Sequence, residues 1–255
     1  MIENVTEFRK FLNVLPQLSN NEVFFVSLSA RNKYLTLQER EQYSLGRTEM
    51  FGREIIFDNS FESFNLVFKK LKTILEYRKT KNGNTIPDKC LTTYMNLNPS
   101  HTVNSVGNFI KTMTQELLEY TNNVVKGHDT KVNLDRFRNS RSILNTSFQK
   151  TSSRKMFVDI DIDCKNEEIL KVSCDILTKN GAKFFVVKTQ GGWHVVVKRE
   201  TLKFNYVKYV IEHCNTLINN SEFLSGIVEH NKNLMVPVPG TLQANKLVKL
   251  VCVNY

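Results

Sequence analysis

The sequence predicts an α+β fold made of two lobes that share one cleft. Two observations lead to this prediction. The second half of the chain reads as strand, helix, two strands and helix, an order typical of a sheet with helices on one face. The first half has buried strands and amphipathic helices of its own. With 255 residues, 41% of them hydrophobic, the chain can build one large core. We therefore expect a single domain, with an N-terminal α/β lobe over residues 1–150 and a C-terminal lobe over residues 151–255.

Hydrophobic periodicity predicts the elements of the first lobe. We expect helices over 1–21, 37–44, 60–79 and 102–125, and strands over 23–29, 54–57 and 90–97. The last of these helices has a hydrophobic face that we expect to pack on the core: Val103, Val106, Ile110, Met113, Leu117 and Leu118. Residues 126–154 are polar and basic, so they are a candidate lobe connector or nucleic-acid-contacting strip, although a solvated surface is the commoner explanation of such a run.

The second lobe is predicted to contain a strand over 155–163, a helix over 166–180, strands over 183–189 and 193–199, and a helix over 204–219. The two middle strands form a β-hairpin, because two Val- and Phe-rich runs flank a Gly-Gly pair that allows a tight turn. The remaining residues are expected to form an irregular segment.

The first strand of this lobe is the most informative part of the chain. Between Met156 and Asp163, hydrophobic and acidic residues alternate with the period of a β-strand. One face therefore carries three carboxylates, those of Asp159, Asp161 and Asp163. Like charges this close raise one another's pKa, and hard divalent ions such as Mg²⁺ relieve the repulsion through oxygen ligands. This pattern predicts a metal site; the alternative is an edge strand with a solvated acidic face.

Two further motifs follow in the sequence. Gly191 and Gly192 precede His194, and glycines allow phosphate oxygens to approach backbone N–H groups while an imidazole donates a hydrogen bond. The alternative is a plain Gly-Gly hairpin with an incidental histidine. Downstream, Pro239-Gly240-Thr241 forms a turn whose hydroxyl, together with Lys246 and Lys249, is able to reach phosphates. Glu229, just upstream, is a candidate third acid.

Composition narrows the classes of partner. The formal net charge of +10 favours a polyanion, although a basic soluble housekeeping domain has the same balance. No stretch approaches the ~20 hydrophobic residues of a membrane span, and the N-terminus lacks a signal-peptide pattern, so we expect a cytoplasmic protein with no membrane partner. Five scattered cysteines without CxxC spacing suggest reduced thiols and no structural zinc.

These motifs, in this order, resemble the archaeo-eukaryotic primase superfamily, particularly phage and plasmid primase-polymerases. The match covers roughly residues 155–250: Asp159 and Asp161 on a strand, then Gly191-Gly192-Trp193-His194, then Glu229 with Pro239-Gly240-Thr241. The sequence departs from the family before the glycines, where Thr189-Gln190 replace a small hydroxyl residue, and before Pro239, where no basic residue stands. The resemblance implies a two-lobed primase-like core whose C-terminal lobe is a mostly antiparallel, RRM-like sheet with helices on one face.

The resemblance also implies an activity, which is template-directed nucleotidyl transfer. Asp159, Asp161 and Glu229 would be catalytic and would hold two Mg²⁺ or Mn²⁺ ions. The nucleotide-binding residues would be Lys188, Gln190, Gly191, Gly192, His194, Thr241 and Lys246. Expected partners are a single-stranded DNA template, nucleoside triphosphates and a separate replicative helicase, since the chain has no GxxxxGK[ST] loop. By analogy the source is viral or a mobile element, which would place the protein in the host cytoplasm. Two alternatives remain: a catalytically inactive primase-like nucleic-acid-binding subunit and a metal-dependent nuclease.

Overall fold

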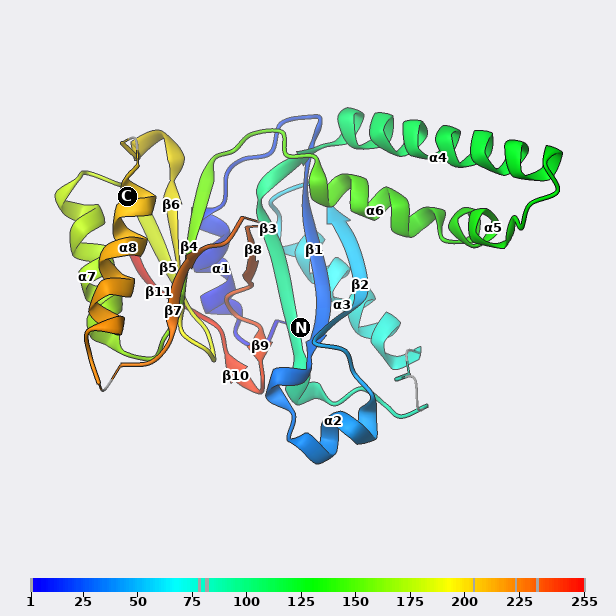
Figure 1. Ribbon diagram of the computed structural model, residues 1–255. Helices are drawn as coiled ribbons and strands as arrows, with labels where there is room; N and C mark the ends of the chain where they lie inside the picture. The colour runs from blue at the N-terminus through cyan, green and yellow to red at the C-terminus, as the bar shows by residue number, and fades with distance from the viewer. Residues whose placement is uncertain are drawn as a thin grey trace.

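The computed structural model describes residues 2–77, 79–80, 83–203, 205–222, 224–232 and 234–254 (Figure 1). Met1, Arg78 and Phe204, which fall within predicted helices, lie outside these residues. The helices are α1 (Val5–Val14), α2 (Leu37–Tyr43), α3 (Phe61–Tyr77), α4 (Thr102–Val125), α5 (Lys131–Arg138), α6 (Ser140–Lys150), α7 (Glu167–Lys179) and α8 (Tyr206–Asn219). The strands are β1 (Glu22–Arg31), β2 (Thr48–Ile56), β3 (Leu91–His101), β4 (Phe157–Asp163), β5 (Phe184–Lys188), β6 (Trp193–Lys198), β7 (Ile227–His230), β8 (Met235–Pro237), β9 (Leu242–Gln243), β10 (Lys246–Leu247) and β11 (Lys249–Asn254).

Two antiparallel sheets lie side by side, with α1 between them (Figure 1). The first has the strand order β10-β9-β3-β1-β2, with β8 also paired to β3, and the second has the order β11-β5-β6-β4-β7. The predicted α+β class is therefore confirmed. In the second sheet, Ile160 and Ile162 of β4 pack on one face with Ile169 of α7 and Val210 of α8. The opposite face of β4, which carries the aspartates, is turned toward the first sheet.

The two sheets share one hydrophobic core. Phe8 of α1 packs against Phe64 of α3, with 5.4 Å between ring centroids. Across the junction, Phe11 lies 6.5 Å from Phe185 of β5, and Phe185 lies 5.8 Å from Phe157 at the start of β4. All five rings belong to the same buried cluster. Helix α1 thus joins the two sheets through its aromatic residues, which fixes β4 against the first lobe.

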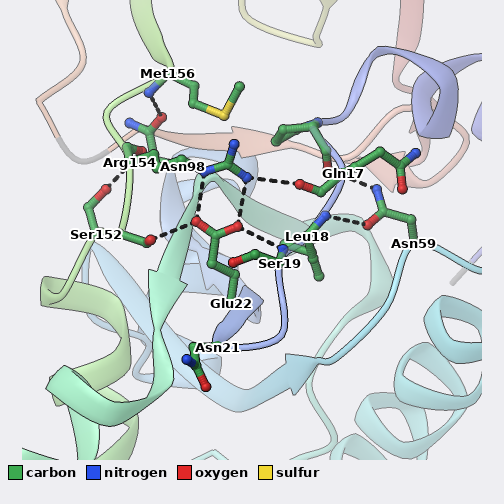
Figure 2. A network of polar contacts seen from close by, with 12 residues as sticks. Gln17, Leu18, Ser19, Asn21, Glu22, Asn59, Asn98, Ser152, Arg154 and Met156 are labelled. Atoms are coloured by element: carbon green, nitrogen blue, oxygen red, sulfur yellow. Dashed lines mark hydrogen bonds and ion pairs between the residues drawn. The ribbon is translucent and has the colours of Figure 1, made fainter.

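A polar network ties the chain entering β4 to the first lobe (Figure 2). Arg154 donates from Nε and Nη2 to the carboxylate of Glu22, at 2.7 and 2.6 Å. The same buried carboxylate accepts the Ser153 hydroxyl at 2.6 Å and the Ser19 N–H at 2.9 Å. Beside it, Asn98 Oδ1 accepts two successive N–H groups at residues 156 and 157, at 2.8 and 3.0 Å. These bonds set where β4 begins relative to β1 and β3.

The segment predicted to be irregular contains five short strands, so that expectation was wrong. β7 and β11 form the two edges of the second sheet, whereas β8 and β9 pair with β3 in the first. Residues 235–247 therefore belong to the first sheet and not to the predicted C-terminal lobe over 151–255. Strands of two to six residues separated by turns are too short to show a period in the sequence.

The bounds of α4 match the predicted helix over 102–125, but its orientation does not. Val103, Ile110 and Leu118, expected to face the core, are 60%, 58% and 61% exposed. The covered face is polar: Glu116 is buried, accepts a hydrogen bond from Asn133, and forms an ion pair with Arg136 of α5. Helices α4, α5 and α6 together form an arm that extends from the first sheet (Figure 1). Among the described residues, no helix combines the length and the hydrophobicity needed to cross a bilayer.

Candidate active site

Three neighbouring strands bring the predicted acids and the histidine into one row. In the register of the second sheet, Asp161 of β4 lies opposite His194 of β6 on one side and Glu229 of β7 on the other. Residues directly opposite each other in antiparallel strands project from the same face. Asp159 and Asp163, two positions before and after Asp161, project from that face as well. The structure thus gathers four carboxylates and one imidazole on the face turned toward the first lobe.

Asp159 is fully buried and is engaged by its neighbours. Its Oδ2 atom lies 2.9 Å from Nδ1 of His194 and accepts a hydrogen bond from Asn231 Nδ2 at 2.7 Å. Its Oδ1 atom is buried without a hydrogen-bond partner among the described residues. On the other side of the imidazole, Nε2 of His194 lies 3.7 Å from Asp161 Oδ1. Burial lowers the pKa of His194, but the two aspartates outweigh that effect and hold the pKa above its ordinary value. We therefore expect a protonated imidazolium at neutral pH.

The environment of Asp161 combines burial with nearby negative charge. Burial raises the pKa of Asp161, His194 lowers it, and the charges of Asp159, Asp163 and Glu229 raise it further, with a net increase. A carboxyl group whose pKa is raised by burial and by like charges gains from any further cation placed beside it. Burial is the largest of these causes, and the three neighbouring carboxylates add to it.

A cleft of about 380 Å³ opens over this row. Asp161, Asp163 and Glu229 line it together with His194. Asp163 and Glu229 are exposed and Asp161 is partly so, whereas Asp159 is fully buried beside the imidazole. The carboxylates available to a ligand in the cleft are therefore Asp161, Asp163 and Glu229. Strand alternation places Asp163 on this face, and in the structure it lines the cleft beside Asp161.

The facing wall of the cleft comes from the first lobe and is basic. Arg31 at the end of β1, Lys33 just beyond it and Arg47 before β2 line the cleft, as do the rings of Tyr34 and Tyr94. Arg31 Nη1 donates to Tyr94 Oη at 3.1 Å, and burial raises the pKa of Tyr34. Nothing in the sequence around Arg31 to Tyr34 indicates that this segment faces the acidic strand.

The Gly-Gly turn is shaped by close packing. A Cβ atom on Gly192 would lie 1.9 Å from the carbonyl oxygen of Ile162, so only glycine fits there. The Gly192 N–H donates to Thr189 Oγ1 at 3.2 Å, and the Gln190 N–H donates to a glutamine side chain of β9 at 2.8 Å. These two backbone donors are used within the protein. Gly191 and Gly192 line the cleft, but the Gly192 N–H, expected to meet a phosphate, is bonded to Thr189, and the Gln190 N–H ties the hairpin to the first sheet.

The remaining predicted nucleotide ligands lie apart from this cleft. Thr241 is fully buried and its hydroxyl donates to the Val238 carbonyl at 2.7 Å, so it holds the Pro-Gly-Thr turn closed. The prediction that Thr241 binds the nucleotide is therefore wrong, and its role is structural. Lys188 is exposed and lies 3.5 Å from Glu167, and Lys246 is exposed in β10. Neither lysine lines the cleft as the structure describes it.

The carboxylate oxygens that line the cleft are suitable ligands for a divalent cation. No three His, Cys, Asp or Glu side chains within the described part of the chain are arranged as a ready-made metal centre. The donors that line the cleft nevertheless are carboxylate oxygens, the ligands that Mg²⁺ and Mn²⁺ prefer. The pKa of Asp161 is raised first by burial and then by the neighbouring carboxylates, so a cation bound beside it would favour its charged form.

Comparison with known proteins adds no relative. No protein-family model matches the chain, no curated protein matches it, and no solved structure matches it. The resemblance to the archaeo-eukaryotic primase superfamily therefore rests on the motifs alone.

Proposed function

We propose that this protein is a template-directed nucleotidyltransferase of the primase-polymerase type, which joins nucleoside triphosphates on a DNA template. One observation carries the proposal: a row of His194, Asp161 and Glu229 across three strands faces a wall of Arg31 and Lys33. Acidic groups opposite basic groups suit a substrate that carries a triphosphate and binds through cations.

Asp161, Glu229 and Asp163 are the residues that would hold the metal ions, because their carboxylates line the cleft. When bound, two Mg²⁺ or Mn²⁺ ions supply the charge that lowers the pKa of an attacking 3′-hydroxyl and neutralises a triphosphate. Asp159, expected from the sequence to be a direct ligand, instead holds His194 in this arrangement. In this proposal, Asp159 orients the imidazole of His194 and favours its protonated form.

The other residues of the cleft would bind and orient the nucleotide. A protonated His194 is a hydrogen-bond donor from both ring nitrogens, so Nε2 is the atom that would meet a phosphate oxygen. Arg31, Lys33 and Arg47 add positive charge from the opposite wall. Because these groups come from two sheets joined by a common core, they need little rearrangement to act together.

Primer extension with the Asp161→Asn variant tests the proposal. The protein is incubated with a primed template, nucleoside triphosphates and Mn²⁺, and the product lengths are resolved on a gel. We expect extension by the wild type and a loss of at least a hundredfold in Asp161→Asn, because removing a metal-site charge removes transition-state stabilisation worth about 3 kcal/mol or more. Asp175→Asn, at an exposed position of α7, is the matched control. Undiminished extension by folded Asp161→Asn would refute the proposal.

The second candidate is a catalytically inactive primase-like nucleic-acid-binding protein. It is favoured by the direct pairing of Asp159 with His194, in which two groups of the expected site engage each other. This candidate predicts binding of a template without extension under any divalent ion. A metal-dependent nuclease would shorten the labelled strand in the same experiment, so one gel separates the three functions.

A further inference from the structure

A second and larger hollow adjoins the candidate active site. It has a volume of about 1320 Å³ and lies between the two lobes, where β3 and α6 approach β4, β7 and α8. Gln149 and Asn231 line both this groove and the cleft over Asp161. The groove and the cleft are therefore neighbours that share part of their lining.

The walls of the groove are strongly basic. Six cationic side chains line it, all of them exposed: Lys150, Lys155, Arg199, Lys203, Lys208 and Lys232. Among the described residues that line it, Glu212 is the one acidic side chain, and its carboxylate lies 3.5 Å from Lys208. The groove thus has an excess of about five positive charges. Such a surplus attracts a polyanion, and each cation that contacts a phosphate releases condensed counterions.

The floor of the groove has a different character. The side chains of Leu202, Val207 and Ile211 form a half-buried hydrophobic strip. The ring of Tyr206 lies half-buried beside them, and asparagine amides line the end nearest β3. Bases with exposed faces stack on aromatic rings and pack on hydrophobic groups, whereas a duplex presents mainly its phosphates. Cations at the rim and a stacking surface below are the combination expected for a single strand.

We propose that this groove binds single-stranded nucleic acid and leads it to the cleft over Asp161. The strand's phosphates contact the basic rim, and its bases face Tyr206 and the hydrophobic floor. Identifying this strand as the template rests on the proposed function. It also changes the expected location: the polar run over 126–154 was the candidate contact strip, yet most of the rim comes from residues after 154.

Binding of a labelled oligonucleotide tests the groove directly. Fluorescence anisotropy with a 16-nucleotide thymidine strand, in EDTA and without nucleotides, is measured over a series of salt concentrations. The test variant combines Arg199→Ala, Lys203→Ala and Lys232→Ala. If each side chain contacts one phosphate, the slope of log K against log salt falls by about 2 and binding at 150 mM salt weakens about 50-fold. The matched control removes three exposed lysines elsewhere, with Lys69→Ala, Lys72→Ala and Lys171→Ala.

A second variant separates stacking from charge. Tyr206→Ala should weaken binding at least fivefold while leaving the salt slope unchanged, because a stacking contact releases no counterions. A duplex of that length should bind more weakly than the single strand. Circular dichroism confirms that the surface variants are folded.

Three results would overturn the inference: no binding by the wild type, equal losses in the test and control variants, or tighter binding of duplex than of single strand. These results are independent of catalysis, because metal and nucleotide are absent. Normal oligonucleotide binding with no primer extension would leave the groove standing and count against the proposed function. Primer extension by the wild type together with normal oligonucleotide binding by the triple variant would support the proposed function and refute the groove.

Discussion

Replacing Glu22 with glutamine should destabilise the fold in a way that depends on pH. Burial alone would raise the pKa of Glu22, but the hydrogen bonds from Arg154, Ser153 and Ser19 outweigh it and lower the pKa to about 2 (Figure 2). The side chain is 2% exposed, so solvent screens these contacts little on the glutamate side. Arg154 is 44% exposed, so solvent screens its charge, and the stability calculated from the pKa of Glu22 is an upper value.

The magnitude follows from the difference between the folded and unfolded carboxyl groups. A pKa of about 2 in place of the ordinary 4.5 corresponds to about 3 kcal/mol of stability at neutral pH, at about 1.4 kcal/mol for each tenfold change in acidity. Because the folded pKa is the lower one, this stability is fully present above about pH 4.5. It declines as the pH falls toward 2, and by pH 3 less than half of it remains.

Urea unfolding at pH 7 and at pH 3 measures this difference. Glu22→Gln should lose up to about 3 kcal/mol in the free energy of unfolding at pH 7 and less than half as much at pH 3. Glu62→Gln, at an exposed position in the first turn of α3, is the control and should change stability by less than about 0.5 kcal/mol at both pH values. An equal loss at the two pH values, or a loss below about 0.5 kcal/mol at pH 7, would refute the reasoning.

Three further substitutions test the packing around the site. Gly192→Ala should cost about 3 kcal/mol or more in thermal unfolding, because its Cβ would meet a backbone oxygen of β4 at 1.9 Å, whereas Gly191→Ala meets a movable side chain and should cost far less. Asn98→Ala removes the acceptor of two N–H groups at the start of β4 and should cost about 2 kcal/mol in urea unfolding; a loss below about 0.5 kcal/mol would contradict this role. Phe185→Ala opens the core between the sheets and should cost about 3–5 kcal/mol, whereas a loss under about 1 kcal/mol would show that the lobes do not depend on it.

Local sequence patterns predicted where the helices and longer strands lie in the sequence better than they predicted what packs against each of them. The period of α4 gave its two ends correctly, because helical spacing depends only on residues a few positions apart. Its hydrophobic face was assigned to the core on the general rule that such faces are buried, yet Val103 and Leu118 are exposed. A period locates a face on a helix but contains no information on what covers it. The short strands of the last 30 residues were missed because two to six residues are too few to show a period, and four of the five pair with strands far away in the sequence.

In the site, the sequence likewise does not predict how deeply each aspartate is buried. Strand alternation correctly put Asp159, Asp161 and Asp163 on one face, but it treats the three positions as equivalent. In the folded chain they lie at increasing distance from the aromatic junction at Phe157, so the first is fully buried, the second is partly covered and the third is exposed. Register across β6 and β7 then decides their chemistry, because it places His194 and Glu229 on either side of Asp161. An acidic strand therefore becomes a candidate active site through the strands that pair with it, which its own sequence does not specify.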